Sequence, residues 1–310
     1  MILTFTPNPA VDQTIFVEKL HLGEVNRFQT AQLDPAGKGI NASRMAHRLG
    51  WPTVAFGFLA GEIGRIAQHA LDAEHLQHHF IQVPGQTRLN VTIVDGASKM
   101  STSLYGPGPP VPEEALRTME DLIRFWLPAT RVLVLAGSLP PGAPKDTQAT
   151  YVRLAQSFGV KTILDADGEA LRQGVAANPS LIKPNTEEAE RLLGRSLPNI
   201  DAIVDAARDL SARGIETVTI SMGAQGLVCA QGDHVWRVRP PTVEPRSTVG
   251  SGDSLVAGLA IALARGDHIV DGLRLGTAAG AATAMTTGTS LGTAAEVQAL
   301  LPKVDVEVIR

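Results

Sequence analysis

Short apolar runs alternate with longer amphipathic segments along most of the chain. The runs 2–6, 53–59 and 131–136 consist mainly of apolar residues, which is typical of strands buried on both faces. Segments with apolar positions at helical spacing separate these runs. The strand–helix–strand order predicts an α/β fold, in which a mainly parallel sheet is covered by helices on both faces.

The same pattern predicts the other elements of this α/β domain. Further strands are expected at 162–164, 181–183 and 217–221, with a hairpin of 227–230 and 234–238. Helices are expected at 40–49, 63–73, 112–126, 147–158, 200–213, 254–265, 272–286 and 294–300.

A different pattern near the amino terminus predicts a second, smaller sheet. Apolar and polar residues alternate at 11–17 and 26–33, as in strands with one face in water. Antiparallel strands are also expected at 80–83, 87–94 and 101–104. We therefore expect one domain over 1–310, with a small β-rich flap inserted in it from about 11–33 and 87–105.

The stretch Ser247–Ser254 is predicted to be a turn that opens into a helix. Gly250 and Gly252 let the backbone approach a ligand closely, and the apolar helix that follows directs unpaired N–H groups at the same place. Such a helix start binds anions, especially phosphates. Asp253 has two interpretations here: a base that accepts a proton from an attacking hydroxyl, or an ordinary capping residue.

A second glycine-rich turn, 35–39, precedes the helix expected at 40–49. Two such helix openings indicate two anion sites, which would suit a phosphate donor and a phosphorylated acceptor. Ligands of open α/β sheets bind at the carboxyl ends of the strands. Polar candidates at those ends are Gly137–Ser138, Asp165, Lys183–Asn185 and Ser221–Gly223.

Two common phosphate-binding motifs are excluded by the residues. In a P-loop, a lysine followed by Ser or Thr closes the motif, whereas Gly39 follows Lys38. The dinucleotide fingerprint requires Gly or Ala three residues after its second glycine, where Leu255 stands after Gly252.

Composition narrows the class of protein. The 310-residue chain is 44% hydrophobic and 19% charged, with a net charge of −4. It contains no basic block, so neither nucleic acid nor membrane is an expected partner. The one cysteine, Cys229, has no partner for an internal disulfide. Without a long apolar run or a signal-peptide pattern, the sequence predicts a cytoplasmic location.

The chain resembles the ribokinase-type sugar kinases of the PfkB family along nearly its whole length. The two family signatures are represented by 36–41 and 247–254, and the stretches 137–140, 183–188 and 221–226 lie between them in the family's order. The resemblance implies a ribokinase-like three-layer α/β/α domain with a small β-sheet lid, which corresponds to the flap.

Within the family, Asn8–Asp12 and Thr87–Asn90 resemble the phosphosugar branch. That branch contains 1-phosphofructokinase, tagatose-6-phosphate kinase and the minor bacterial 6-phosphofructokinase. Lys38 is shared with the first two, and Asn8–Ala10 and Asn90 favour the first. By contrast, 167–171 and 288–291 look more like the third. The resemblance thus favours fructose 1-phosphate as the acceptor, with the other two substrates open.

The resemblance also implies direct phosphoryl transfer from Mg·ATP to a sugar-phosphate hydroxyl. Asp253 would be the base, and the N–H groups of Gly250, Ser251 and Gly252 would stabilise the moving phosphoryl group. The nucleotide would lie against Asn185, Ser221, Gly223, Gly226, Ser247 and Val249. The acceptor site would comprise Asp12, Arg27, Gly37, Lys38, Gly39, Asn41, Arg88, Asn90 and Ser138, with Lys38, Arg88 and Arg27 holding its phosphate.

Asn185 and Glu188 would organise Mg²⁺, partly through water. The family further implies a homodimer paired through the flap, and a monovalent cation such as K⁺ as an additional cofactor. Two rival functions remain open: a sugar-phosphate sensor that keeps the fold without catalysis, and a kinase for an unphosphorylated sugar.

Overall fold

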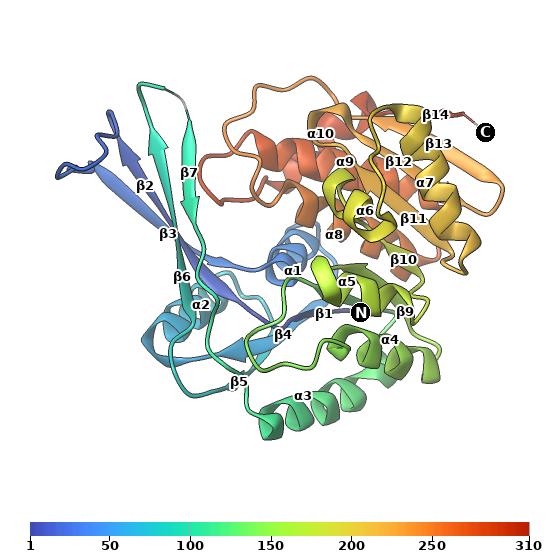
Figure 1. Ribbon diagram of the computed structural model, residues 1–310, viewed down its shortest axis with the longest axis horizontal. Coiled ribbons are helices and arrows are strands. Elements are labelled where there is room, and N and C mark those ends of the chain that lie inside the picture. Colours follow the sequence, from blue (N-terminus) through green and yellow to red (C-terminus); the bar gives the residue numbers. More distant parts are fainter. Residues whose placement is uncertain (99, 310) are drawn as a thin grey trace.

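The computed structural model describes residues 1–98 and 100–309 (Figure 1); Lys99, inside the flap segment expected at 87–105, lies outside these ranges. Its main feature is a ten-stranded sheet of order β14-β13-β12-β11-β10-β9-β8-β1-β4-β5. The strands are β1 (Ile2–Thr6), β4 (Thr53–Leu59), β5 (His78–Gln82), β8 (Val132–Ala136), β9 (Lys161–Asp165), β10 (Leu181–Ile182), β11 (Thr217–Ser221), β12 (Leu227–Gln231), β13 (His234–Arg239) and β14 (Asp305–Val308).

The strands from β5 to β11 are parallel, and β12, β13 and β14 continue the sheet in antiparallel pairs. β1, β4 and β8 are completely buried, as their apolar runs predict. One expectation was wrong: the strand expected at 80–83 is β5, which pairs in parallel with β4 at the edge of the main sheet. A helix crosses over between the two strands and returns the chain to the same end of the sheet, so the pair cannot be antiparallel.

Helices cover both faces of the main sheet, which confirms the three-layer α/β/α fold (Figure 1). One core cluster joins α3, α4, α5, α6 and α7 to the sheet, and the other joins α1, α8, α9 and α10 to it. The bounds are α1 (Lys38–Arg48), α2 (Gly61–Ala73), α3 (Glu113–Trp126), α4 (Thr147–Ser157), α5 (Gly168–Val175), α6 (Thr186–Leu193), α7 (Ile200–Ala212), α8 (Ser251–Arg265), α9 (Ile269–Ala284) and α10 (Ala294–Leu300). Within the described ranges, no helix combines the length and the apolar character needed to cross a bilayer.

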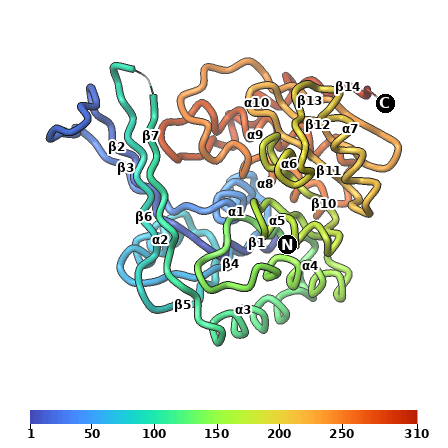
Figure 2. Tube along the Cα trace, viewed as in Figure 1, coloured from blue at the N-terminus to red at the C-terminus, as the bar shows by residue number. Residues whose placement is uncertain are grey.

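A separate four-stranded sheet projects from one side of the molecule, and we call it the flap (Figure 2). Its order is β3-β2-β6-β7, from β2 (Ala10–Val17), β3 (Thr30–Ala36), β6 (Arg88–Asp95) and β7 (Ser101–Leu104). β6 pairs with β7 in antiparallel fashion, as expected, but it pairs in parallel with β2, and there the expected antiparallel orientation was wrong. The strand expected at 26–33 begins at Thr30 and runs through Pro35, because β3 is an edge strand where proline is tolerated.

Candidate active site

The turn expected at 247–254 lies at the centre of the candidate site, and the helix that it opens into, α8, begins at Ser251 rather than at Ser254. Gly250 is the N-cap of α8 and has a left-handed backbone (φ +79°), and it has no side chain with which to cap the helix. Asp253 is therefore not the capping residue. Its Oδ2 accepts a hydrogen bond from Asn41 Nδ2 at 2.8 Å, which links α8 to α1. This geometry removes the capping interpretation of Asp253.

The surroundings of Asp253 adjust its acidity. Its side chain is 8% exposed. Burial, followed by the negative charge of Asp165, raises the pKa of Asp253 to about 6, while Asn41 and two lysines oppose the rise. A carboxyl with this pKa is mostly ionised at neutral pH and still basic enough to accept a proton.

A cluster of charges, in which Asp165, Glu188 and Lys183 are buried and Lys38 is partly exposed, adjoins this carboxylate. Lys38 Nζ lies 3.0 Å from Asp165 Oδ1 and 3.4 Å from Glu188 Oε1, and Lys183 Nζ lies 3.3 Å from Asp165 Oδ2. Burial alone would raise the pKa of Asp165, but Lys183 and Lys38 together lower it. Burial would likewise lower the pKa of Lys38, but Asp165 and Glu188 raise it well above the usual range. Lys38 therefore remains charged.

Asp165 and Lys183 are the residues whose contribution the sequence did not reveal. Both follow or end strands at the expected edge of the sheet, but nothing in their spacing shows that one carboxylate holds two lysines. A methyl group built at Gly252 would lie 3.5 Å from Lys183 Nζ. Lys183 therefore places a cation beside the start of α8, where a transferred phosphoryl group would carry negative charge.

The glycines at the start of α1 are constrained by packing. A Cβ at Gly39 would lie 2.5 Å from Thr6 Oγ1 and 3.2 Å from the Phe5 carbonyl oxygen, and one at Gly37 would lie 2.7 Å from Thr6 Cγ2. Gly37 also has φ +132°. These glycines allow α1 to begin directly against the end of β1, which brings Lys38 and Asn41 to the charged cluster.

The flap contributes polar side chains from the neighbouring strands β2 and β6. Asn90 Nδ2 donates to Asp12 Oδ1 at 2.8 Å, and both side chains are buried. Burial raises the pKa of Asp12 against the opposing effects of Asn90 and Arg88. The Arg88 guanidinium donates to backbone carbonyls, at 2.8 Å to Asn8 and 3.3 Å to Gly106. Within residues 1–98 and 100–309, no carboxylate forms an ion pair with Arg88.

Two of the expected acceptor residues differ in position from these. Arg27 is exposed in the connection between β2 and β3, at the outer part of the flap. Ser138 follows β8, and its Oγ accepts a hydrogen bond from Asn8 Nδ2 at 3.4 Å. The structure therefore joins Ser138 to the base of the flap, whereas Arg27 is exposed within residues 18–29 between β2 and β3.

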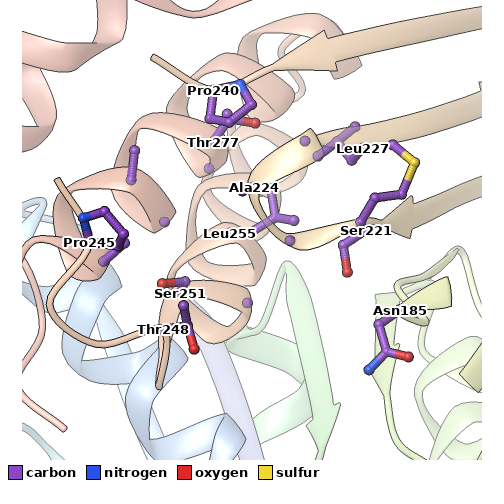
Figure 3. Close-up of a pocket in the computed structure, with 18 of the residues that line it drawn as sticks. Asn185, Ser221, Ala224, Leu227, Pro240, Pro245, Thr248, Ser251, Leu255 and Thr277 are labelled. Atoms are coloured by element: carbon purple, nitrogen blue, oxygen red, sulfur yellow. The ribbon is translucent and has the colours of Figure 1, made fainter. Parts of the chain in front are cut away.

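A pocket of about 710 Å³ opens beside the start of α8 (Figure 3), a size suited to a nucleotide. The expected residues Asn185, Ser221, Gly223 and Gly226 line it, as do Ser251, Gly252 and Thr248, the last lying between the expected Ser247 and Val249. Much of the remaining wall is apolar and comes from Met222, Leu227, Pro240, Pro241, Val243 and Leu255.

Buried hydroxyls in this wall suit a bound polar molecule. Ser251 Oγ and Thr277 Oγ1 are buried, and no residue in the described ranges forms a hydrogen bond with either; both residues line the pocket. Buried hydroxyls without partners are costly, and the phosphates or sugar of a nucleotide would supply the missing partners. The pocket therefore fits ATP in size, in its apolar wall and in its unpaired polar groups.

The expected magnesium residues form the start of α6. Asn185 Oδ1 accepts from the Glu188 N–H and Glu188 Oε2 accepts from the Asn185 N–H, both at 2.8 Å, which is a capping box. The other Glu188 oxygen faces Lys38. No group of three or more His, Cys, Asp or Glu side chains in the described ranges is placed to hold a metal. The oxygens of Asn185 and Glu188 fit a Mg²⁺ ion that is held mainly by phosphate oxygens and water.

Comparisons with known proteins agree with this geometry. The pfkB family carbohydrate kinase model matches residues 7–296. The chain is 33% identical to a 1-phosphofructokinase of Bacillus subtilis over 306 residues, which is 99% of both proteins. It is 35% identical to a 1-phosphofructokinase of Rhodobacter capsulatus over 281 residues, covering 89% of this chain and 88% of the relative.

Solved structures show the same fold. Phosphofructokinase-2 from Escherichia coli, in complex with substrates and products, has a TM-score of 0.92 at 29% identity, covering 97% of this chain and 98% of the other. That protein has also been solved with potassium, at a TM-score of 0.91, and in a tetrameric inhibited form, at 0.89.

Proposed function

Because the chain belongs to the pfkB family of carbohydrate kinases, we propose that it phosphorylates fructose 1-phosphate with ATP to give fructose 1,6-bisphosphate. The observation that carries the proposal is Asp253, a buried carboxylate in the first turn of α8 that adjoins both the nucleotide-sized pocket and the lysine cluster. Relatives named 1-phosphofructokinase, at 32 to 36% identity, support this choice of acceptor.

In the proposed reaction, Asp253 accepts the proton of the 6-hydroxyl group as its oxygen attacks the γ-phosphorus. The bond from that phosphorus to the bridging oxygen breaks, and ADP leaves with the electron pair. The N–H groups of Gly250, Ser251 and Gly252, together with Lys183, neutralise charge on the transferred group. Mg²⁺, held near Asn185 and Glu188, supplies charge neutralisation on the phosphates when bound.

We propose that the flap and α1 hold the acceptor between them. Asp12, Asn90 and Asn41 would bind sugar hydroxyls, with Gly37, Gly39 and Ser138 forming the adjoining surface. Arg88 is the first choice for the substrate's own phosphate, because its contacts are uncharged carbonyls. Lys38 would also contact this phosphate, but Asp165 and Glu188 already pair with its positive charge.

We further propose a homodimer through the flap. The connection between β2 and β3 exposes Leu22 and Val25, at 88% and 89%, and Phe28 and Tyr105 are also exposed on the flap. Pairing of two flaps would cover these side chains and would bring Arg27 against a second copy. A monomer by light scattering at assay concentration would contradict this proposal. The cytoplasmic location stays a prediction.

A monovalent cation is proposed on the likeness to the potassium complex of phosphofructokinase-2 from Escherichia coli. The test is to compare the rate in potassium with the rate in tetramethylammonium, at constant ionic strength. A higher rate in potassium is expected. Equal rates would remove the cation from the proposal.

The substrate is tested by ADP release with Mg·ATP and fructose 1-phosphate, fructose 6-phosphate or tagatose 6-phosphate. Free fructose and ribose serve as controls. The highest kcat/KM is expected with fructose 1-phosphate. Activity on a free sugar alone would keep the kinase and discard the phosphate role of Arg88 and Lys38. No ADP release with any of the five sugars, in a protein that still binds ATP, would favour the sugar-phosphate sensor.

A further inference from the structure

The loop between α9 and α10, residues 286–292, is held between the flap and the start of α8. It extends from α9 toward the flap (Figure 1). Thr289 Oγ1 donates to Asp34 Oδ2 at 2.7 Å, and both side chains are buried. Gln32 Nε2 donates to Ser290 Oγ at 2.7 Å and to Asp34 Oδ2 at the same distance. Two side chains of β3 thus grip two consecutive residues of the loop.

The neighbouring strand of the flap contacts the same loop. Gly288 has φ +64°, and a Cβ built on it would lie 3.0 Å from Thr14 Oγ1. Thr14 pairs with Gln32 across β2 and β3, and Asp12 pairs with Asp34. Of the two strands that contact the loop, β2 also carries Asp12, which we place against the acceptor, and β3 is paired with it.

The other end of the loop is fixed to the body of the molecule. Arg48 Nη1 of α1 donates to the Leu291 carbonyl at 2.6 Å. The Gly292 N–H donates to Thr283 Oγ1 at 3.1 Å. Thr283 Oγ1 also shares a hydrogen bond with Ser254 Oγ, at 2.8 Å, in the first turn of α8.

Leu291 brings this loop against the anion-binding turn itself. Its side chain is 3% exposed, and Leu291 Cδ2 would lie 2.9 Å from a Cβ built on Gly250. The left-handed turn at Gly250 directs the N–H groups at the start of α8, so a shift of Leu291 would change where they point.

We propose that the buried Asp34–Thr289 contact is a positioning contact that links acceptor binding on the flap to the geometry of the anion-binding turn. The acceptor, held through Asp12, fixes the strands β2 and β3. These strands fix residues 288–290 of the loop, and Leu291 then holds Gly250 in place for phosphoryl transfer. Neither Asp34 nor Thr289 touches the reacting atoms. The inference rests on the proposed kinase function for its effect on rate, but not for the link itself.

The test compares Thr289→Val with Thr289→Ser and with Thr92→Val. Valine keeps the shape of Thr289 and removes its hydroxyl, whereas serine keeps the hydroxyl. Thr92 is a matched control, because its Oγ1 forms a hydrogen bond inside the flap, with Ser103 Oγ at 2.9 Å. For Thr289→Val we expect kcat to fall about tenfold, with the KM of Mg·ATP unchanged. Thr289→Ser should recover most of the rate, and Thr92→Val should keep it.

Amide hydrogen exchange of the unliganded protein tests the link without any turnover. Thr289→Val should speed exchange in both 286–292 and 250–254, whereas Thr92→Val should change neither. The inference is overturned if only the loop responds, if Thr289→Val loses no more rate than Thr92→Val, or if Thr289→Ser falls as far as Thr289→Val. A wild-type protein that is silent on every acceptor but shows the exchange result would fail the proposed function and keep the link.

Discussion

The starts of α1 and α8 show the same sequence signal, glycines at a helix opening, but the glycines serve different physical purposes. At α1, Thr6 and the Phe5 backbone occupy the space beside Gly37 and Gly39, so the start of α1 packs directly against the end of β1. At α8, the space next to Gly252 contains only Lys183 Nζ, at ordinary contact distance, and opens on the pocket.

This difference shows what a glycine-rich turn does and does not indicate. At α8, Gly252 leaves space for a ligand beside the helix start, whereas Gly250 is packed against Leu291. At α1 the glycines let the helix start against β1, and the chemical groups of that opening are the side chains of Lys38 and Asn41. The expectation of two anion sites stays a prediction. If both exist, the first would bind through a cation and the second through backbone N–H groups.

The largest effect is expected at the α8 opening, from Asp253→Asn. Loss of the base should lower kcat by about 10²- to 10⁴-fold, with little change in the KM of Mg·ATP. ADP release with the best acceptor measures it. Asp271→Asn is the matched control, since Asp271 is an exposed acid in the first turn of α9. A near-normal rate for Asp253→Asn would remove it as the base.

Substitution of Gly252 or Gly39 by alanine should distinguish the roles of the glycines at the starts of α8 and α1. Gly252→Ala meets no steric barrier and should leave the free energy of unfolding unchanged or raise it by up to about 1 kcal/mol, yet lower kcat/KM about 10- to 100-fold by crowding the ligand. Gly39→Ala should instead cost about 1–3 kcal/mol of stability. Urea unfolding and ADP release measure the two quantities. Equal stability losses in both variants would contradict the distinction.

Lys38→Ala tests whether the α1 opening binds an anion through its cation. We expect the KM of the phosphosugar to rise roughly tenfold, because a charge-assisted contact is lost, with the KM of Mg·ATP unchanged. The exposed Lys145→Ala is the control. A rise confined to the KM of Mg·ATP would place Lys38 on the donor side, through Glu188, and an unchanged acceptor KM would end its phosphate role.

The smallest effect is a displaced pH profile. The ionised form of Asp253 is the base, so kcat/KM should rise with pH around an apparent pKa of about 6 and level off above it. The hydrogen bond from Asn41 lowers that pKa, so Asn41→Ala should move the acid limb to higher pH. Asn199→Ala, which removes the N-cap of α7, should leave the limb in place. An unmoved limb in Asn41→Ala would mean that another group titrates.

Most of the main sheet could be predicted because its buried strands are continuous apolar runs in the sequence. The direction of strand pairing was harder to predict. β5 and β6 each pair in parallel with a strand from which a crossover connection separates them. The alternation of polar and apolar residues is the same in parallel and antiparallel strands, so it does not indicate this direction. The helix at 168–175 and the strand at 305–308 had no expectation, because both are short, at 8 and 4 residues.

The candidate site could be predicted as a set of motifs but not as a network. Asp253, Asn185 and Lys38 follow from local residue patterns. The contact of Lys38 with Asp165 joins positions 127 residues apart, and that of Asn41 with Asp253 joins positions 212 apart. Such contacts depend on the tertiary fold, so no spacing in the chain could have indicated them.

The parallel pairing of β2 with β6 also has a consequence for the order of folding. Asp12 and Asn90 are 78 positions apart, and α1, β4, α2 and β5 lie between their strands. Strands this far apart pair only after the intervening chain has been compacted, because loop closure costs entropy before contacts repay it. In pulse-labelled refolding, amides of β2 and β6 should gain protection after those of β1 and β4. A chain arrested midway would have its core sheet and no surface to receive a sugar.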